Sequence, residues 1–277
     1  MAGKKKDTSL LHHLIGSRSL VWNLAKNDIK KKFAGSYFGV VWAFVQPVIT
    51  VLLYWFVFEK GLNSKATDLR TGIEIPFVLW LTAGLVPWFY FQEALNGGTG
   101  VLVEYSYLVK KVVFQIDMLP VVKMISALFT HLFFVAFTIV LFICMGYMPD
   151  WYALQVVYYS FCMILFATGL VYATSAVTVF FRDMKEVVGI LLQIGMWVTP
   201  IMWNFETMVQ IPGWAIAVLK LNPMYYIVSG YRNALINHIG FWEDMGITVY
   251  FWVVTAVILV LGTTVFKRLR PHFADVL

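Results

Sequence analysis

Asn27 to Phe58, NDIKKKFAGSYFGVVWAFVQPVITVLLYWFVF, is the stretch that decides the fold of this chain. Three consecutive lysines, Lys30, Lys31 and Lys32, precede a turn-prone Ala-Gly-Ser sequence and then a long apolar run. A helix of about 20 apolar residues crosses the hydrocarbon core of a bilayer, and basic residues stay on its cytoplasmic side. We therefore expect the chain to pass here from the cytoplasmic surface into a membrane.

The composition of the whole chain also indicates a membrane protein. Of its 277 residues 60% are hydrophobic and 13% charged, with a mean hydropathy of +0.76. A soluble domain of this size cannot bury so much apolar surface, so we expect an all-α integral membrane fold. The net charge of +6 lies at the ends of apolar runs, which argues against nucleic-acid binding. Cys144 and Cys162 fall inside apolar runs and are interpreted as small core residues.

Six apolar runs are expected to span the membrane. They cover residues 37–58, 76–95, 119–145, 151–181, 187–203 and 246–266. This divides the chain into a cytoplasmic N-terminus at 1–36, a transmembrane domain at 37–266 and a cytoplasmic tail at 267–277. Most of the 21 Lys and Arg residues then lie on the cytoplasmic side together with both termini, as the positive-inside rule requires.

Residues 204–245 are too apolar for an ordinary outer loop. The runs 211–221 and 223–236 are each too short to cross a bilayer, and Asn222-Pro223 between them is a typical helix start. We expect two half-helices that form a re-entrant or surface-lying hairpin on the outer side. The alternative is a seventh span, which would place the basic C-terminal residues outside.

Two further segments are expected to form helices at the cytoplasmic surface. Residues 10–33 carry apolar residues at helical spacing and are interpreted as an amphipathic helix at the membrane interface, which holds anionic lipid or docks a partner. Residues 104–120, EYSYLVKKVVFQIDMLP, mix charged and bulky apolar residues. This segment predicts a short helix that stops at Leu119-Pro120 and fits a groove of a partner.

Few ionisable residues interrupt the apolar runs. His131 could relay protons, but a hydrogen bond across a helix interface is the favoured interpretation. Lys123 is expected to extend toward the headgroups. Arg182 and Asp183 predict a tight cytoplasmic turn with a structural role.

The sequence carries none of the motifs that would make the chain an enzyme. It has no acidic metal cluster, no phosphate-binding glycine loop and no nucleophile elbow. We expect no catalytic residue, metal or cofactor here, so a separate subunit would have to supply the energy for active transport.

Aromatic residues make up 17% of the chain. Aromatic residues near the ends of spans are explained by the aromatic belts at the membrane surface. Each of the others, considered one at a time, is better explained by packing between helices. As a set, Tyr37, Trp42, Phe89 and Trp197 predict an aromatic wall along a passage, since aromatic rings contact the apolar faces of sugars.

Five motifs in order resemble the permease subunits of type 2 ABC exporters that export polysaccharides and teichoic acids. They are NDIKKKFAGSYFGVVWAFVQP at 27–47, VKKVVFQIDMLP at 109–120, FRD at 181–183, TPIMW at 199–203 and LNPMYYIVSGYRNALI at 221–236. The resemblance extends over about residues 20–270. YWFVFEKGL at 54–62 and LVPWFYF at 85–91 are most similar to wall teichoic acid exporters, although O-antigen and capsular exporters share most of the features.

The resemblance implies a particular assembly. Two copies of the chain would surround a pathway above two nucleotide-binding subunits, which would hold ATP and Mg²⁺. The amphipathic segment would be the interface helix, and residues 104–118 would contain the coupling helix, although Gln115 replaces an expected proline. ATPase contacts would come from Tyr107, Lys110, Lys111 and Phe114. The hairpin at 204–245 matches external re-entrant helices of the family.

These expectations combine into one functional hypothesis. The chain would be the subunit that moves a lipid-linked anionic glycopolymer across the bacterial cytoplasmic membrane. Lys30, Lys31 and Lys32 would lie near the pyrophosphate of the lipid, because phosphate attracts basic residues. The alternatives are an O-antigen or capsular polysaccharide exporter, a drug or small-lipid exporter of the same architecture, and a membrane enzyme that acts on lipid-linked sugars.

Overall fold

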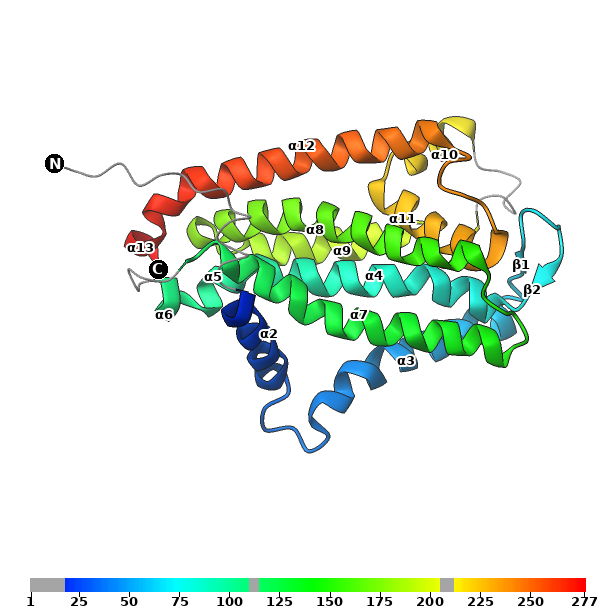
Figure 1. The fold of residues 1–277 in the computed structure, drawn as a ribbon, viewed down its shortest axis with the longest axis horizontal. Coiled ribbons are helices and arrows are strands. Elements are labelled where there is room, and N and C mark those ends of the chain that lie inside the picture. Colours follow the sequence, from blue (N-terminus) through cyan, green and yellow to red (C-terminus); the bar gives the residue numbers. More distant parts are fainter. Residues whose placement is uncertain (1–17, 110–114, 205–211) are drawn as a thin grey trace.

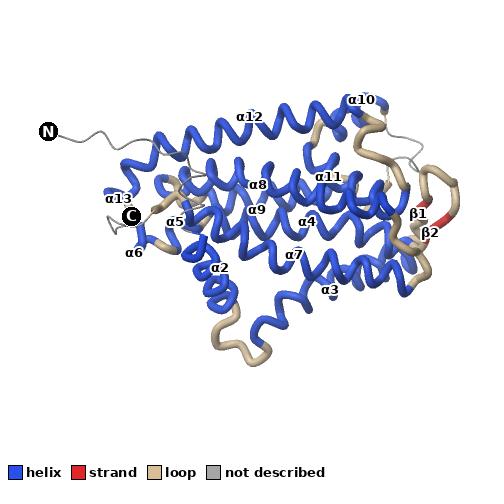
Figure 2. Tube along the Cα trace, in the orientation of Figure 1, coloured by secondary structure: helices blue, strands red, loops and turns tan. Residues whose placement is uncertain are grey.

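A computed structural model of the chain describes residues 18–109, 115–204 and 212–277. The fold is predominantly helical, as predicted (Figures 1 and 2). The helices are α2 (Arg18–Lys32), α3 (Trp42–Trp55), α4 (Phe77–Thr99), α5 (Val101–Glu104), α6 (Ser106–Val109), α7 (Met118–Cys144), α8 (Gln155–Phe180), α9 (Met184–Val198), α10 (Gly213–Lys220), α11 (Pro223–Arg232), α12 (Met245–Leu269) and α13 (Phe273–Val276). Strands β1 (Ala66–Thr67) and β2 (Glu74–Ile75) form a small antiparallel pair.

Shorter helical turns extend several of these elements. They are the 3₁₀ turns Gly39–Val41, Trp151–Leu154 and Arg270–His272, and the π-helical turns Phe56–Gly61 and Asn233–Asn237.

Helix α4 is the centre of the bundle. Figure 1 shows α4 running lengthwise beside α7 and α8, and its residues pack against those of α7, α8, α9 and α11. Leu79, Leu81 and Leu85 are fully buried. The first turns of α4 are apolar on almost every side, and such a stretch can be buried completely by its neighbours. Helix α4 therefore positions the elements around it.

Helices α8 and α12 approach each other through glycines. A Cβ atom at Gly262 of α12 would overlap the backbone carbonyl of Gly169 in α8. Small residues allow this close backbone packing in membrane helices, where packing replaces the hydrophobic effect as the driving force.

Helix α2 confirms that the segment before the first span has an apolar face. Val21 and Ala25 of α2 are buried against Met118 and Val122 of α7. The predicted residues 10–17 lie outside the described residues.

Helix α3 is bound more loosely than the rest. Val51 is its only buried residue, whereas Leu52 and Leu53 are more than half exposed in the single chain. This apolar surface is suited to contact with lipid or with other protein.

Among the residues that the structure describes, four helical stretches are long and apolar enough to cross a membrane: Gly39–Gly61, Met118–Cys144, Trp151–Phe180 and Met245–Val276. They match the first, third, fourth and sixth predicted spans. The second corresponds to α4, whose last turns carry polar residues. The fifth corresponds to α9, whose 15 residues extend only about 22 Å, less than the roughly 30 Å of a bilayer core. The count of six spans stays a prediction.

Two predicted boundaries are corrected by the structure, both at prolines. Helix α9 ends at Val198, before the predicted residue 203, because Thr199 precedes Pro200 and takes an extended conformation with ψ 127°. Leu119-Pro120 was expected to stop a helix, yet both lie in the first turn of α7. Proline is tolerated there because the amide groups of the first turn have no intrahelical acceptor.

The predicted helix within 104–118 is only partly visible. Helices α5 and α6 are four residues each and are separated at Tyr105. Residues 110–114, with the predicted contacts Lys110, Lys111 and Phe114, lie outside the described residues.

The break at Asn222-Pro223 is confirmed. Helix α10 ends at Lys220, and α11 begins at Pro223 with the Asn222 side chain accepting a hydrogen bond of 3.0 Å from the amide of Met224. The Asn222 amide also donates to Thr199 Oγ1 at 2.8 Å, which joins α11 to the end of α9. Where the two helices lie in the membrane stays a prediction.

The two cysteines differ in environment. Cys162 is buried, as predicted, whereas Cys144 is exposed, because it is the last residue of α7. Both are free thiols.

Candidate functional site

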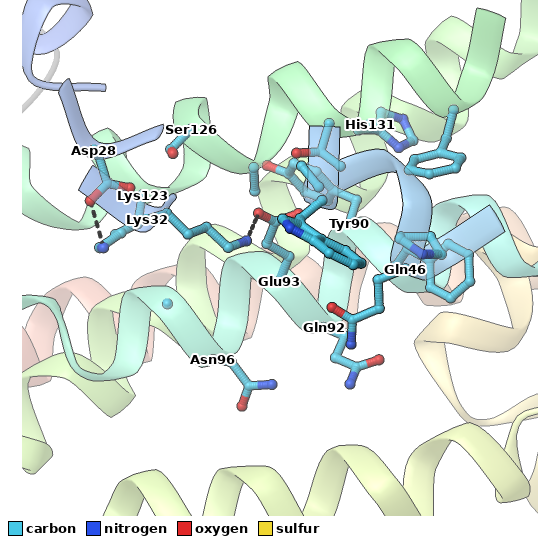
Figure 3. Close-up of a pocket in the computed structure, with 18 of the residues that line it drawn as sticks. Asp28, Lys32, Gln46, Tyr90, Gln92, Glu93, Asn96, Lys123, Ser126 and His131 are labelled. Carbon is cyan, nitrogen blue, oxygen red and sulfur yellow. Dashed lines mark hydrogen bonds and ion pairs between the residues drawn. The ribbon is translucent and has the colours of Figure 1, made fainter. Parts of the chain in front are cut away.

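A partly open cavity of about 760 Å³ lies between α2, α3, α4, α7 and α9. Its size falls within the range of about 300–1,000 Å³ that is typical of ligand sites. Figure 3 shows side chains from several helices turned toward one space. The lining combines charged, amide, hydroxyl and aromatic groups, which is uncommon inside a membrane bundle.

A buried ionic network forms one end of the cavity. The Lys123 ammonium of α7 lies 2.6 Å from Asp28 Oδ1 of α2 and 2.9 Å from Glu104 Oε2 of α5. The Tyr105 hydroxyl donates a hydrogen bond of 2.8 Å to the same oxygen of Asp28. Burial, with this hydrogen bond, raises the pKa of Tyr105, so its phenol remains a donor at neutral pH. The network joins three predicted parts: the interface helix, the start of the segment at 104–118 that was predicted to contain the coupling helix, and a span.

Two of the three predicted lysines line the cavity. Lys32 Nζ lies 2.6 Å from Glu93 Oε1 of α4, and this pair connects the end of α2 to the central helix. The Lys31 ammonium lies 5.3 Å from the ring centre of Tyr105 and 6.0 Å from that of Tyr107. Lys30 is exposed and does not line the cavity.

Uncharged polar groups line the rest of the cavity. Gln92 and Asn96 lie four residues apart on α4 and therefore on one face of that helix. Gln46 and Thr50 have the same spacing on α3. In Figure 3 the Gln46 and Gln92 side chains face the same space. This part of the wall offers several hydrogen-bond donors and acceptors.

A hydrogen-bonded network fixes His131 in the cavity wall. His131 Nε2 lies 3.2 Å from Ser160 Oγ of α8 and 3.0 Å from the Tyr231 hydroxyl of α11, and these two hydroxyls are 2.6 Å apart. The predicted hydrogen bond across a helix interface is thus confirmed. A buried and shared network of this kind holds the ring in one orientation.

The aromatic candidates separate into two groups. Trp42 and Phe89 line the cavity, where Trp42 is 44% exposed. Tyr37, 95% exposed, and Trp197, 56% exposed, do not. Within one chain, therefore, two of the four predicted aromatic wall residues line the cavity.

The remaining candidates lie outside the cavity. Tyr107 of α6 is half exposed at the same end of the bundle as Lys31. Arg182 and Asp183 occupy the short turn between α8 and α9, and both are exposed.

Lys123 has protein partners that the sequence interpretation did not include. Its side chain is only 13% exposed, because Asp28 and Glu104 hold it inside the network. An acid at position 28 follows the apolar residues of α2 at helical spacing, one turn after Ala25. That placement on the buried face was a signal for a buried ion pair with a basic residue of a neighbouring helix.

Gln46, Gln92 and Asn96 were not predicted as site residues. Each interrupts or ends an apolar run, and a polar side chain within membrane helices usually faces the bundle interior. The spacing of these residues could be seen in the sequence. That they line one cavity depends on how α3 packs against α4. Within the described parts of the chain, no three His, Cys, Asp or Glu residues gather as a metal site would require.

The C-terminal segment packs against the same end of the bundle. Phe273 of α13 is fully buried among Tyr172, Phe266 and neighbouring apolar residues. Arg270 Nη1 lies 2.7 Å from Asp117 Oδ2, just before α7. Figure 1 shows α13 beside α5 and α6. The C-terminal segment therefore packs against and stabilises the residues that precede the third predicted span.

Comparison with known proteins identifies the fold family. The family described as ABC-2 type transporter matches residues 19–236, which are most of the chain and include every residue of the cavity lining. The chain is 25% identical over 266 residues to the O-antigen export system permease protein RfbA of Myxococcus xanthus, covering 96% of this chain and 98% of that protein. Two proteins of the same name from Klebsiella pneumoniae are 21% and 22% identical, each covering 92% of this chain and 93% of the relative.

These matches extend along nearly the full chain and agree with its several long apolar helices. The resemblance to permeases of type 2 ABC exporters is thereby confirmed at the family level, whereas the similarity to teichoic acid exporters is not. The chain belongs to the ABC-2 type transporter family.

Proposed function

We propose that this chain is the membrane subunit of an ATP-driven exporter of a lipid-linked polysaccharide. The observation that carries the proposal is the cavity, which begins at the lysines of α2 and continues between membrane helices along amide and aromatic side chains. Such a lining suits a long hydroxyl-rich molecule better than an ion or a small apolar drug. The names of the relatives, O-antigen export system permease proteins, favour the same class of cargo.

The polymer is proposed to be of the O-antigen type. The initial hypothesis favoured wall teichoic acid on the basis of residues 54–62 and 85–91. The three relatives match over almost the whole chain, whereas those two motifs are short, so we give the relatives more weight.

The proposed assembly contains two copies of this chain and two nucleotide-binding subunits that hold ATP and Mg²⁺. Partner ATPase subunits follow from the family, and a second copy would cover exposed apolar surface such as that of α3. Tyr107, Lys110, Lys111 and Phe114 are proposed to contact the ATPase from the predicted coupling segment at 104–118.

The proposed topology has six spans in the bacterial cytoplasmic membrane with both termini in the cytoplasm. It is supported by the basic ends of α2 and α12, which carry Lys30, Lys31, Lys32, Lys267 and Arg268. Residues 204–245 would form the outer hairpin, with α10 and α11 as its two half-helices.

Within this topology the lysines of α2 are proposed to attract the pyrophosphate of the lipid carrier, and Trp42 and Phe89 to form the pathway wall. Tyr37 and Trp197 would join the wall only where a second copy completes it, since neither lines the cavity of one chain.

The proposal is tested by deleting the gene for the chain in its own bacterium and measuring surface polysaccharide and lipid-linked polymer inside the cell. We expect surface polymer to disappear and lipid-linked polymer to accumulate, with both reversed when the chain is restored. Unchanged surface polymer in the deletion strain would refute the proposal.

A further inference from the structure

We propose that the cavity selects an uncharged, hydroxyl-rich stretch of polymer and disfavours a chain with a phosphate in every repeat. This inference rests on the proposed function and specifies its substrate class. It is drawn from how the charges of the lining are distributed and paired.

Charge is confined to the end of the cavity near α2 and α5. The basic and acidic lining residues are Lys31, Lys32, Lys123, Lys185, Asp28, Glu93 and Glu104. Figure 3 shows Asp28, Lys32 and Lys123 together on one side, with Lys32 extending to Glu93. Among the labelled residues, Gln46, Tyr90 and His131 lie beyond Glu93 on the other side.

Three carboxylates offset the charge of the four lysines in the lining, Lys31, Lys32, Lys123 and Lys185. Lys123 has two carboxylate partners, Asp28 and Glu104, and Lys32 has Glu93. Lys31 faces the rings of Tyr105 and Tyr107. The remaining positive charge is enough to attract a single phosphate-bearing headgroup at the end of the cavity near α2 and α5. The positive charge does not continue along the rest of the cavity wall.

The inner wall offers the groups that bind sugars. Gln46 and Gln92 each present a carbonyl acceptor and an amide donor, and a sugar hydroxyl can pair with either. Asn96 offers the same groups nearer the charged end, since it follows Glu93 on α4 toward α5. Trp42 and Phe89 add aromatic surfaces for the C–H faces of the rings. None of these contacts requires a charge on the polymer.

A polyanion would meet a penalty at the same wall. A phosphate moved from water into a membrane cavity loses hydration, and only paired cations can repay this cost. The wall beyond Glu93 provides none within the described residues, and Lys32 is already paired with the Glu93 carboxylate. A phosphate in each repeat would incur the penalty at every step of transport.

The test changes the charge of one neutral wall residue in the full exporter in its own cells. Gln46→Ala, Gln46→Glu and Gln46→Lys are compared by the amount of native polymer that reaches the surface. Thr264 of α12 is exposed, does not line the cavity and is replaced by Ala, Glu and Lys as a control. Protein level and melting temperature are measured for every variant, and only variants that fold are scored.

We expect Gln46→Ala to reduce export about fivefold through lost hydrogen bonds. We expect the Glu and Lys variants to agree within about threefold, because an uncharged cargo has no preference for either sign. Export by the Thr264 variants should not change.

A loss in Gln46→Glu that exceeds the loss in Gln46→Lys by more than about tenfold would overturn the inference, since that pattern marks an anionic cargo. Unchanged export in all three Gln46 variants would also overturn it, because the wall would then not contact the polymer. In both cases the deletion strain tells the two proposals apart: if deletion still abolishes surface polysaccharide, only the charge selection fails.

Discussion

Lys123 Nζ of α7 and Asp28 Oδ1 of α2 are 2.6 Å apart, and both side chains are almost completely buried. Removing one partner of a buried ion pair leaves the other charge without compensation, which typically costs about 3–5 kcal/mol. We therefore expect Lys123→Met to lower the free energy of unfolding by roughly this amount. The measurement is the melting temperature of the purified chain in one detergent.

The control for that prediction is the second carboxylate on the same lysine. Glu104 is 50% exposed, and an exposed ion pair contributes only about 0–1 kcal/mol. Glu104→Gln should therefore change the melting temperature very little. Equal losses in both variants would mean that burial does not govern this network.

Phe273 tests whether the C-terminal segment stabilises the fold. Its ring is fully buried, and replacing a buried phenylalanine by alanine costs about 3–5 kcal/mol. Phe273→Ala should lower the melting temperature, whereas Val276→Ala on the same short helix should not, since Val276 is 46% exposed. A stable Phe273→Ala chain would show that α13 is not needed to hold the fold.

Trp42 tests the pathway wall. Loss of its indole removes an aromatic surface from the cavity, and we expect Trp42→Ala to reduce export at least about tenfold while Trp42→Phe retains most of it. Surface polymer is measured in cells that contain equal amounts of each variant. Normal export by Trp42→Ala would remove this residue from the pathway.

Asp68 gives a prediction about pH. Burial raises the pKa of this carboxyl, but hydrogen bonds from the Thr71 hydroxyl and from the amides of Arg70 and Thr71 outweigh burial and lower the pKa below 3.8. A lowered folded pKa means that the carboxylate stabilises the fold above the unfolded pKa, and that this stabilisation is lost as the pH falls through the folded value.

The measurement compares the melting temperatures of Asp68→Asn and the unchanged chain across pH. The difference should be full at pH 7 and should shrink as the pH falls below about 3.8. A difference that grows toward acid pH would contradict the hydrogen bonding of Asp68.

The pattern of apolar residues in the sequence was sufficient to predict most of the helices but not the contacts between them. The apolar runs placed α7, α8 and α12 within a few residues, because a long span has a strong signal. The end of α9 was missed because the effect of Pro200 on Thr199 is a local backbone property that hydropathy does not contain. The capping pair Asn222-Pro223 was recognised because its chemistry is itself local.

The site was less predictable for the same reason. Lys31, Lys32, Trp42 and Phe89 were selected by residue type, and the cavity contains all four. The partnership of Lys123 with Asp28, 95 residues away, depends on α2 packing against α7, which residue spacing alone does not specify. Trp197 has the same chemistry as Trp42, yet its position on α9 turns it away from the cavity.

Movement of polysaccharide across the membrane by this chain and a partner ATPase can be measured in inverted membrane vesicles. Vesicles that contain both subunits and labelled lipid-linked polymer are incubated with ATP and then treated from outside with a glycosidase. We expect ATP to make the polymer resistant to the enzyme, and vesicles without this chain to show no such protection. Polymer that stays accessible with ATP, in vesicles where both subunits are folded and assembled, would contradict the proposed function.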